Sequence, residues 1–206
     1  MRYEKGRKDD SRRRIVEVAA QRFRNDGIAA SGLTGIMAEA GLTNGAFYPH
    51  FQSKAELVRE SLTAALEDQA KQMGDALASG GLEAALAIYL STEHRDDPGQ
   101  GCVSAALLPE VARQPEETRD LYAEHVLALV RQLAKALPPL TRDGEGVALG
   151  IYATLVGAMQ LARAVPSKAL SDRILAAAAE AVRAAFHSGA DAPPQPRETR
   201  FAKKAS

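Results

Sequence analysis

The chain has 206 residues, of which 46% are hydrophobic and 25% charged, and its formal net charge is zero. This globular balance argues against a chain that is disordered throughout or embedded in a membrane, and the length suits one domain or two small domains that share a core. Alanine and leucine outnumber the β-branched residues, which favours an all-α fold. The single cysteine, Cys102, cannot form an internal disulfide, and with four scattered histidines it makes no zinc pattern. We therefore expect no metal, no cofactor and a cytoplasmic location.

Charge is distributed unevenly along this neutral chain. Residues 1–54 carry ten Lys or Arg against six Asp or Glu, whereas residues 61–189 carry eleven against sixteen. A basic N-terminal part indicates contact with a polyanion, although an ordinary solvated helix would carry the same charges. The first residues lack the apolar run of a signal peptide, and the longest uncharged stretch, 146–162, is shorter than the about 20 residues that span a bilayer. We expect no membrane partner.

Glycine and proline divide the sequence into helical blocks, and no stretch shows the sustained alternation of a strand. The first predicted helices cover 10–25, 32–40 with Ser31 as N-cap, and 44–51 with Thr43 as N-cap. A longer helix begins after Ser53 and runs to about residue 78, where Gly80 and Gly81 break it. Later Pro and Gly signals predict a bundle of helices over 82–92, 103–113, 116–137, 141–165 and 167–187, followed by a disordered tail.

The second and third predicted helices have the form of a helix-turn-helix. Gly41 ends the second helix, and Thr43 can cap the third only two residues later. A helix presented in this way fits the major groove of DNA. Helical hairpins with a glycine turn also occur in ordinary protein cores, so geometry alone leaves both interpretations open.

The stretch from Ile36 to Lys54 reads IMAEAGLTNGAFYPHFQSK and resembles the motif of the tetracycline-repressor (TetR) family of bacterial transcriptional regulators. It has the Ala-Gly turn, the Thr cap, the following Gly, the Tyr-x-His-Phe run and the Ser-Lys start of the next helix. Pro49 removes a backbone donor inside the predicted recognition helix, so we expect a bend or a tighter turn there.

The resemblance implies an organisation and a function. It implies an all-α chain with an N-terminal helix-turn-helix domain over residues 1–52, a helical effector-binding and dimerisation domain over 53–188, and a tail over 189–206. It also implies a homodimer that binds a palindromic double-stranded DNA operator and is released by a small-molecule effector, without enzymatic activity.

The motif assigns roles to individual side chains. The amide of Asn44 can pair with adenine, although an idle surface Asn would look the same, while Gly45 permits close approach and Ala46 can touch a thymine methyl. Hydroxyl, imidazole and ammonium groups further along can bind phosphate. The predicted DNA contacts are Thr34, Thr43, Asn44, Gly45, Ala46, Tyr48, His50 and Lys54.

Two aromatic residues and the arginines before the motif have different expected roles. Phe47 and Phe51, four residues apart, are expected to fill the core beneath the recognition helix rather than stack on bases. The arginines at 12–14, with the basic residues before them, are expected to form a flexible arm that raises the local potential or enters a minor groove.

Six side chains within the predicted bundle are candidate effector contacts, although residues of these types are more often ordinary core residues. They are Tyr89, His94, Cys102, His125, Tyr152 and Met159. Cys102 follows a Gly-rich loop and is predicted to lie at a helix N-terminus, which lowers the pKa of a thiol. A regulator that senses electrophiles or oxidants through Cys102 is therefore an alternative, with an inert buried thiol as the simpler interpretation.

Small residues line one face of the helix predicted over 141–165. Gly146, Gly150, Ala153 and Gly157 are spaced by four, three and four residues, which permits close packing against another helix, either in a dimer or within one subunit. A helical enzyme or ligand carrier is the alternative to a regulator, but the chain shows no phosphate loop, no zinc-protease motif, no nucleophile elbow and no Cys pair.

Overall fold

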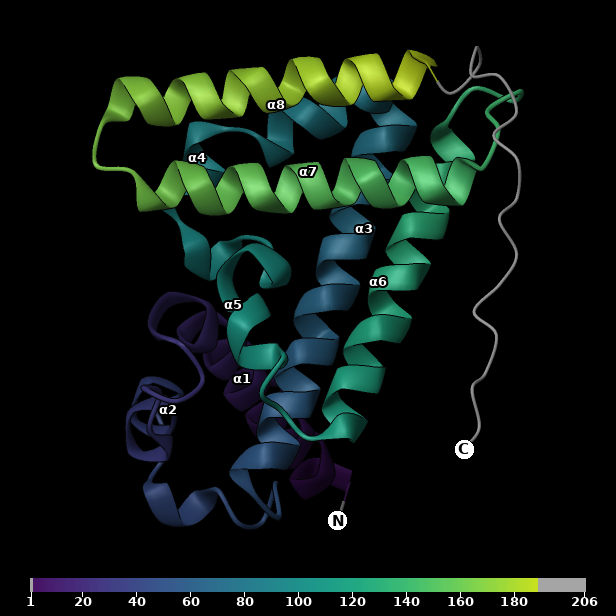
Figure 1. The fold of residues 1–206 in the computed structure, drawn as a ribbon. Helices are drawn as coiled ribbons and strands as arrows, with labels where there is room; N and C mark the ends of the chain where they lie inside the picture. The colour runs from purple at the N-terminus through teal and green to yellow at the C-terminus, as the bar shows by residue number, and fades with distance from the viewer. Residues whose placement is uncertain (1, 189–206) are drawn as a thin grey trace, which may run out of the picture.

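The structure is a computed structural model that describes residues 2–188, and within that range it contains helices and no strands, as the composition predicts. Its N-terminal part comprises α1, α2 and the short 3₁₀ helix η1, and the rest of the described chain forms the bundle (Figure 1). The elements are α1 (Arg2–Asp26), α2 (Leu33–Glu39), η1 (Asn44–Ala46), α3 (Lys54–Tyr89), α4 (Thr92–Asp96), η2 (Pro98–Gln100), α5 (Val103–Val111), α6 (Glu116–Ala136), α7 (Gly144–Ala164) and α8 (Lys168–Ser188).

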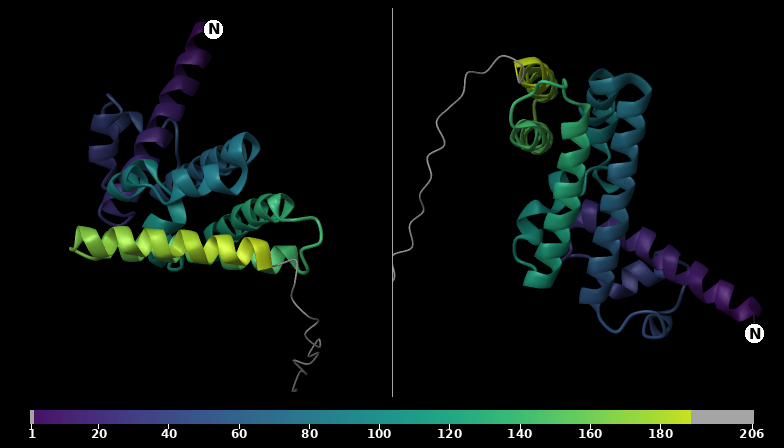
Figure 2. Two further views of the ribbon diagram at one scale, coloured as in Figure 1. Left: turned by 90° about the horizontal axis from the view of Figure 1, so that it is seen from above. Right: turned by 90° about the vertical axis from the view of Figure 1, so that its right-hand side faces the viewer.

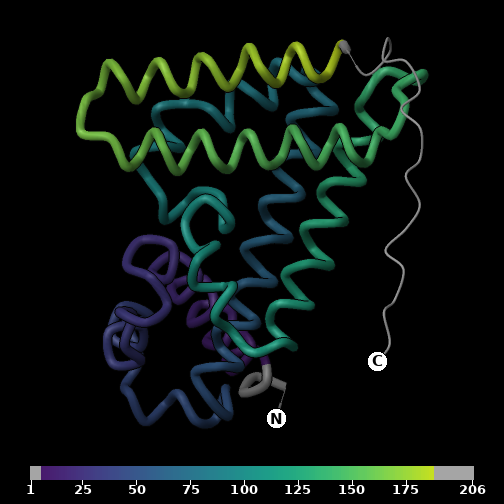
Figure 3. The backbone as a smooth tube through the Cα atoms, in the orientation of Figure 1, coloured from purple at the N-terminus to yellow at the C-terminus, as the bar shows by residue number. Residues whose placement is uncertain are grey.

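The helices form two groups that share α3 and α5. Helices α7 and α8 lie side by side across the ends of α3 and α6, and α1 and α2 gather at the opposite end of α3 (Figures 1 and 3). The N-terminal half of α1 projects away from the body, as Figure 2 shows from two further directions.

Two apolar cores correspond to these groups. The N-terminal core contains Phe23, Phe47 and Phe51 and extends to Leu107 of α5. The second core lies among α3, α6, α7 and α8 and includes Cys102 at the start of α5. Neighbouring residues at one end of α5 belong to different cores. A displacement of this helix would therefore change the packing of both cores.

Most predicted boundaries agree with the structure, with informative exceptions. Ser53 caps α3 by accepting a hydrogen bond from the Glu56 backbone N–H at 3.2 Å, and α3 leaves helical geometry at Gly80 and Gly81, as predicted. The predicted cap Ser31 is wrong. Gly32 occupies the N-cap position of α2, while the buried Ser31 hydroxyl donates to the Gly27 carbonyl at 2.7 Å.

The basic N-terminal segment is helical rather than a flexible arm, because α1 begins at Arg2 and not at residue 10. The predicted disordered tail lies outside the described residues. Helix α7 is long and apolar enough to cross a membrane by length and composition alone, and 44% of its most apolar window is buried. One such helix is weak evidence for a membrane span, because core helices pass the same test. Helix α7 packs against α8 and α6, as expected for a buried helix.

Candidate DNA-binding surface and effector pocket

The turn between α2 and η1 is built from backbone hydrogen bonds around Gly41. The Leu42 N–H donates to the Met37 carbonyl at 2.9 Å, and the Gly41 N–H donates to the Ala38 carbonyl at 3.0 Å. Together with the positive φ of 72° at Gly41, these bonds make a Schellman motif, which ends α2 and redirects the chain. A side chain at this φ would be strained, which explains the glycine.

The predicted helix over 44–51 is wrong in type and length. Only Asn44–Ala46 form a 3₁₀ turn, and the next residues continue as turns in which the backbone N–H groups of His50 and Phe51 donate to the Phe47 carbonyl at 2.9 and 3.1 Å. Pro49 has no N–H, so a regular α-helical ladder cannot run through it. Thr43 stands at the N-cap position in extended geometry, but its hydroxyl makes no cap hydrogen bond.

The recognition turn, residues 43–48, presents its polar residues outward. Thr43, Asn44 and Gly45 are exposed, Ala46 is half-buried, and Tyr48 is 71% exposed. Thr34 of α2 is also exposed. The exposed surface therefore includes the assigned side chains of Thr34, Thr43, Asn44 and Tyr48, whereas His50 and Lys54 are only partly exposed.

Two phenylalanines support this turn from beneath. Phe47 and Phe51 are each 1% exposed, and their rings stack with centroids 5.4 Å apart. The guanidinium of Arg12 lies 4.3 Å from the centre of the Phe51 ring. Both aromatic residues therefore belong to the core, as predicted, and the turn rests on a rigid base.

Lys54, Arg12 and the backbone of His50 are joined to other parts of the protein beside the turn. The Lys54 ammonium donates to the Ile28 carbonyl at 2.6 Å. Arg12 of α1 donates to the His50 carbonyl and pairs with Glu60 and, at 3.3 Å, with Glu56. Burial, followed by the charges of Lys8 and Arg12, lowers the pKa of His50, so its imidazole is neutral near pH 7. These groups position the recognition turn, and the Lys54 ammonium retains two further donors for a phosphate.

A pocket of about 370 Å³ lies within the bundle, close to where it meets α1. Its walls come from the two limbs of α3 on either side of Gly80 and Gly81, from the 91–102 segment and from Arg24 of α1. This volume suits a small organic molecule. Three of the predicted effector contacts, Tyr89, His94 and Cys102, line this pocket.

His94 is fully engaged in holding the pocket wall. Its Nδ1–H donates to the Tyr89 carbonyl at 2.6 Å, and its Nε2 accepts from the Cys102 backbone N–H at 2.9 Å. This pattern requires the neutral imidazole, and burial lowers the pKa of His94 in agreement. His94 thus acts as a structural tie across the 89–102 segment, without a nitrogen left for an effector.

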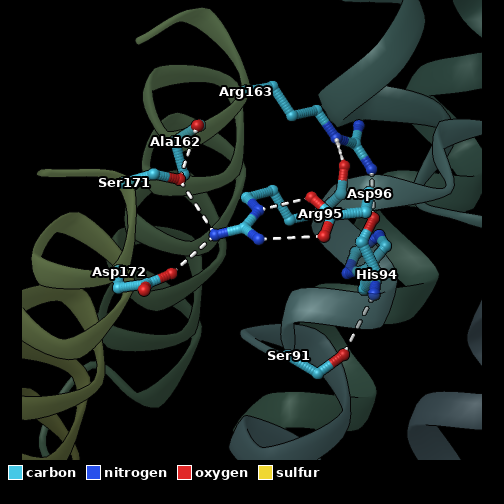
Figure 4. Close-up of polar contacts among 8 residues, drawn as sticks. All are labelled: Ser91, His94, Arg95, Asp96, Ala162, Arg163, Ser171 and Asp172. Atoms are coloured by element: carbon cyan, nitrogen blue, oxygen red, sulfur yellow. Dashed lines mark hydrogen bonds and ion pairs between the residues drawn. The ribbon is translucent and has the colours of Figure 1, made fainter. Parts of the chain in front are cut away.

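A buried arginine fixes the same segment to the last two helices (Figure 4). Arg95 of α4 donates to both carboxylate oxygens of Asp96 at 2.6 and 2.9 Å and to Asp172 of α8 at 2.6 Å. Arg163 of α7 donates to the carbonyls of His94 at 2.6 Å and Arg95 at 3.1 Å. The pocket wall is therefore tied to α7 and α8.

Two further bonds tie the bundle to the N-terminal elements. The Arg24 guanidinium donates through Nε to the Gly99 carbonyl at 2.7 Å, and Glu110 of α5 accepts from the Ala29 backbone N–H at 3.0 Å. Burial lowers the pKa of Arg24, partly offset by Asp68. These two bonds thus connect the pocket segment and α5 to α1 and to the start of the segment that leads to the recognition turn.

Comparison with known proteins shows which family the N-terminal part of the chain resembles. A family model described as bacterial regulatory proteins, tetR family, matches residues 15–61, the region that builds the recognition turn. Residues 15–61 therefore resemble the N-terminal domain of the TetR family. The described residues hold no group of three or more His, Cys, Asp or Glu side chains suited to a metal ion.

Individual relatives support this TetR assignment for the same region. Two curated regulators of Pseudomonas putida are 43% identical to this chain over 53 residues: the HTH-type transcriptional regulator TtgR and the probable HTH-type transcriptional regulator ArpR. The match covers 26% of this chain and 25% of each relative, so the chain spans about a quarter of the length of the curated relatives it matches.

Solved structures of other proteins share the fold over most of the chain. The reduced form of Escherichia coli NemR superposes with a TM-score of 0.71 at 22% identity, covering 84% of this chain and 95% of that one. SCO4454, a TetR-family regulator from Streptomyces coelicolor, gives 0.73 at 20% identity, with coverages of 89% and 97%. At such identities these structures establish the all-α fold alone.

The remaining predicted effector contacts lie outside the pocket. Met159 is fully buried in the second core, and His125 is half-buried on α6. The Tyr152 hydroxyl bonds to the Ser104 hydroxyl at 2.7 Å, and Ser104 bonds Tyr122 at 2.6 Å. Burial raises the pKa of Tyr152, so this network stays neutral.

Sequence reasoning missed Arg24 and Gln69, which both line the pocket. Neither could be found from spacing, because Arg24 belongs to α1 and Gln69 looks like an ordinary polar residue within α3. Cys102 does occupy the N-cap of α5, as predicted, and its sulfur accepts from the Ala105 N–H at 3.5 Å. Cys102 is 2% exposed and lines the pocket.

Proposed function

We propose that this chain is a ligand-responsive DNA-binding regulator, a repressor that a small molecule releases from a palindromic operator in the cytoplasm. One observation carries the proposal: the recognition turn is exposed and rests on the buried rings of Phe47 and Phe51. A rigid, outward polar turn is what groove recognition requires. Asn44 would read a base edge, and Tyr48 would bind a phosphate.

Dimerisation is part of the proposal, because one short turn reads few bases. The outer face of α7 and α8 carries Leu149, Leu161 and Leu170, with Leu161 59% exposed. On α7 an added Cβ at Gly150 or Gly157 would meet no atom within 4 Å, so these glycines do not serve packing within the subunit. An apolar, small-residue face of this kind fits a second copy of the same two helices.

Release would follow from the bonds that connect the pocket to the N-terminal elements. An effector that fills the pocket meets Arg24 of α1 and Cys102 at the start of α5. In this proposal, the protein has one arrangement that binds DNA and one that does not, and the two differ in the positions of α1 and α5. An effector that binds the second arrangement more tightly would increase its population.

DNA binding can be tested without knowledge of the operator. A random-sequence duplex library is selected with the purified chain, and we expect enrichment of an inverted repeat whose binding weakens with salt. Asn44→Ala should relax base preference at one position in each half-site, whereas the exposed Glu124→Ala on α6 should change nothing. A chain that enriches no sequence at any salt concentration is a helical ligand-binding protein or an enzyme instead.

The dimer is tested separately by analytical ultracentrifugation. We expect a dimer for the wild type and a monomer for Leu161→Asp, because a carboxylate would be buried without a partner in the shared face. Leu140→Asp changes an even more exposed leucine in the α6–α7 connection and should leave the dimer intact. A monomeric wild type, or two variants that behave alike, would contradict the assigned face.

A further inference from the structure

The C-terminal end of α1 lies directly against the 3₁₀ turn η2 of the bundle. The Arg24 guanidinium donates through Nε to the Gly99 carbonyl at 2.7 Å. The Asn25 side chain covers Gly99 so closely that a Cβ added at Gly99 would lie 2.5 Å from the Asn25 Nδ2 atom. The absence of a side chain at Gly99 therefore lets the two elements approach. We refer to Arg24, Asn25 and Gly99 as the α1–η2 contact.

On the bundle side, this contact is held by the helices of the proposed dimer face. η2 follows α4 after a single residue. Arg163 of α7 donates to the backbone carbonyls of His94 and Arg95 at 2.6 and 3.1 Å. Arg95 in turn donates to Asp172 of α8 at 2.6 Å (Figure 4). These bonds fix α4, and with it η2, relative to α7 and α8.

On the other side, α1, α2 and the recognition turn form one packed body, which we call the N-terminal unit. Phe23 of α1 lies in the same apolar core as Phe47 and Phe51 beneath the turn. Arg12, near the middle of α1, donates to the His50 carbonyl. Because a close-packed core transmits displacement, the orientation of α1 determines where the recognition turn lies relative to the bundle.

The length of α1 makes that orientation matter on the scale of a base pair. Arg12 and Arg24 are twelve residues apart, so each lies roughly 9 Å from the midpoint between them along the helix. A rotation of about 10° about that midpoint would displace each end by about 1.6 Å. This displacement is enough to lengthen the 2.7 Å bond between Arg24 and Gly99 beyond hydrogen-bonding range. In a dimer two such displacements add to about 3 Å, close to the ~3.4 Å rise between base pairs.

We propose that Arg24 is a positioning residue that sets the half-site spacing of the operator, because its bond to Gly99 holds each recognition turn at a fixed distance from the dimer face. The proposal rests on the DNA-binding, dimeric function given above. An operator with another spacing would require the N-terminal unit to rotate and this bond to break in each subunit. Arg24 is also the residue of α1 that lines the pocket, so an effector bound there meets the α1–η2 contact.

The test measures DNA affinity as a function of half-site spacing. The inverted repeat selected by the wild type is resynthesised with its half-sites one base pair closer and one base pair farther apart, and fluorescence anisotropy gives the three dissociation constants. The wild type should bind both altered duplexes about tenfold or more weakly, the factor expected for a hydrogen bond from a charged donor. Arg24→Met retains an aliphatic stem and removes the donor, so this penalty should fall severalfold.

Arg22→Met is the matched control. Arg22 lies on the same helix, but it pairs with Asp26 and Glu39 at 3.4 and 3.5 Å, within the N-terminal unit. This variant should keep the wild-type spacing preference. Arg24→Lys retains a charged donor and should show an intermediate preference. Urea unfolding compares the stabilities, and if Arg24→Met is unfolded under the assay conditions, Arg24→Lys supplies the comparison with a smaller expected change.

The proposal is overturned if Arg24→Met weakens binding by the same factor on all three duplexes, because a purely structural role lowers affinity without changing the spacing preference. It is also overturned if Arg22→Met changes that preference as much as Arg24→Met does. A wild type that binds all three duplexes equally would refute this inference alone and leave the regulator standing. A wild type that binds no duplex would refute the regulator, and this inference with it.

Discussion

Phe47 and Tyr48 are neighbours in the chain that differ in burial, and truncating each separates support of the recognition turn from contact with DNA. Phe47 is 1% exposed and stacks on Phe51, while Tyr48 is 71% exposed. Replacement of a buried Phe by Ala costs about 3–5 kcal/mol through lost burial and the cavity left behind. For a chain of this size that lowers the melting temperature by roughly 6–20 °C.

Tyr48→Ala should have the opposite effect, with a small loss of stability and a direct loss of DNA affinity. Its edge-to-face contact with Phe47, with ring centres 5.5 Å apart, contributes about 1 kcal/mol or less at an exposed site. Loss of a phosphate hydrogen bond should weaken DNA binding about fivefold on every sequence.

The two variants are compared by urea unfolding followed by circular dichroism, and by fluorescence anisotropy with the selected duplex. Phe47→Ala should lose stability first and DNA binding as a consequence, at temperatures where Tyr48→Ala stays folded and binds weakly. Equal losses of stability would refute the assignment of one ring to the core and the other to the DNA surface.

Three further outcomes follow from the backbone and from His94. Gly41→Ala should lower the free energy of unfolding by about 1–2 kcal/mol, because φ is 72° there, as urea unfolding will show; an unchanged midpoint would contradict the turn geometry. Gly101→Ala would place a Cβ 2.6 Å from the His94 ring and should cost about 1–3 kcal/mol by the same assay, whereas Gly6→Ala, in open space on α1, should be neutral or stabilising. Burial lowers the pKa of His94 in the folded chain, so below about pH 6.5 the unfolded chain binds more protons than the folded one. The contribution of His94 to stability is therefore complete above that pH and is lost as the pH falls. In thermal unfolding between about pH 5 and 7.5, the melting temperature of His94→Asn should fall less steeply with decreasing pH than that of the wild type.

Local signals determined much of the helical framework. The Gly41 turn, the Ser53 cap and the break at Gly80 and Gly81 appear where the sequence predicts them, because each depends on backbone geometry within a few residues. Pro49 indicated the distortion of the recognition turn for the same reason, although the predicted α-helix was reduced to a 3₁₀ turn. The burial of Phe47 and Phe51 followed from their spacing.

Tertiary packing alone decided which polar side chains are free. Lys54 looks like a phosphate contact in the sequence, but its ammonium also meets the Ile28 carbonyl, and His94 looks like an effector contact until its two backbone partners are seen. The pocket joins Arg24 to Gln69 and Cys102 across long stretches of chain. Side-chain identity and spacing specify helices through interactions over about four residues, whereas a cavity exists only after distant helices have packed.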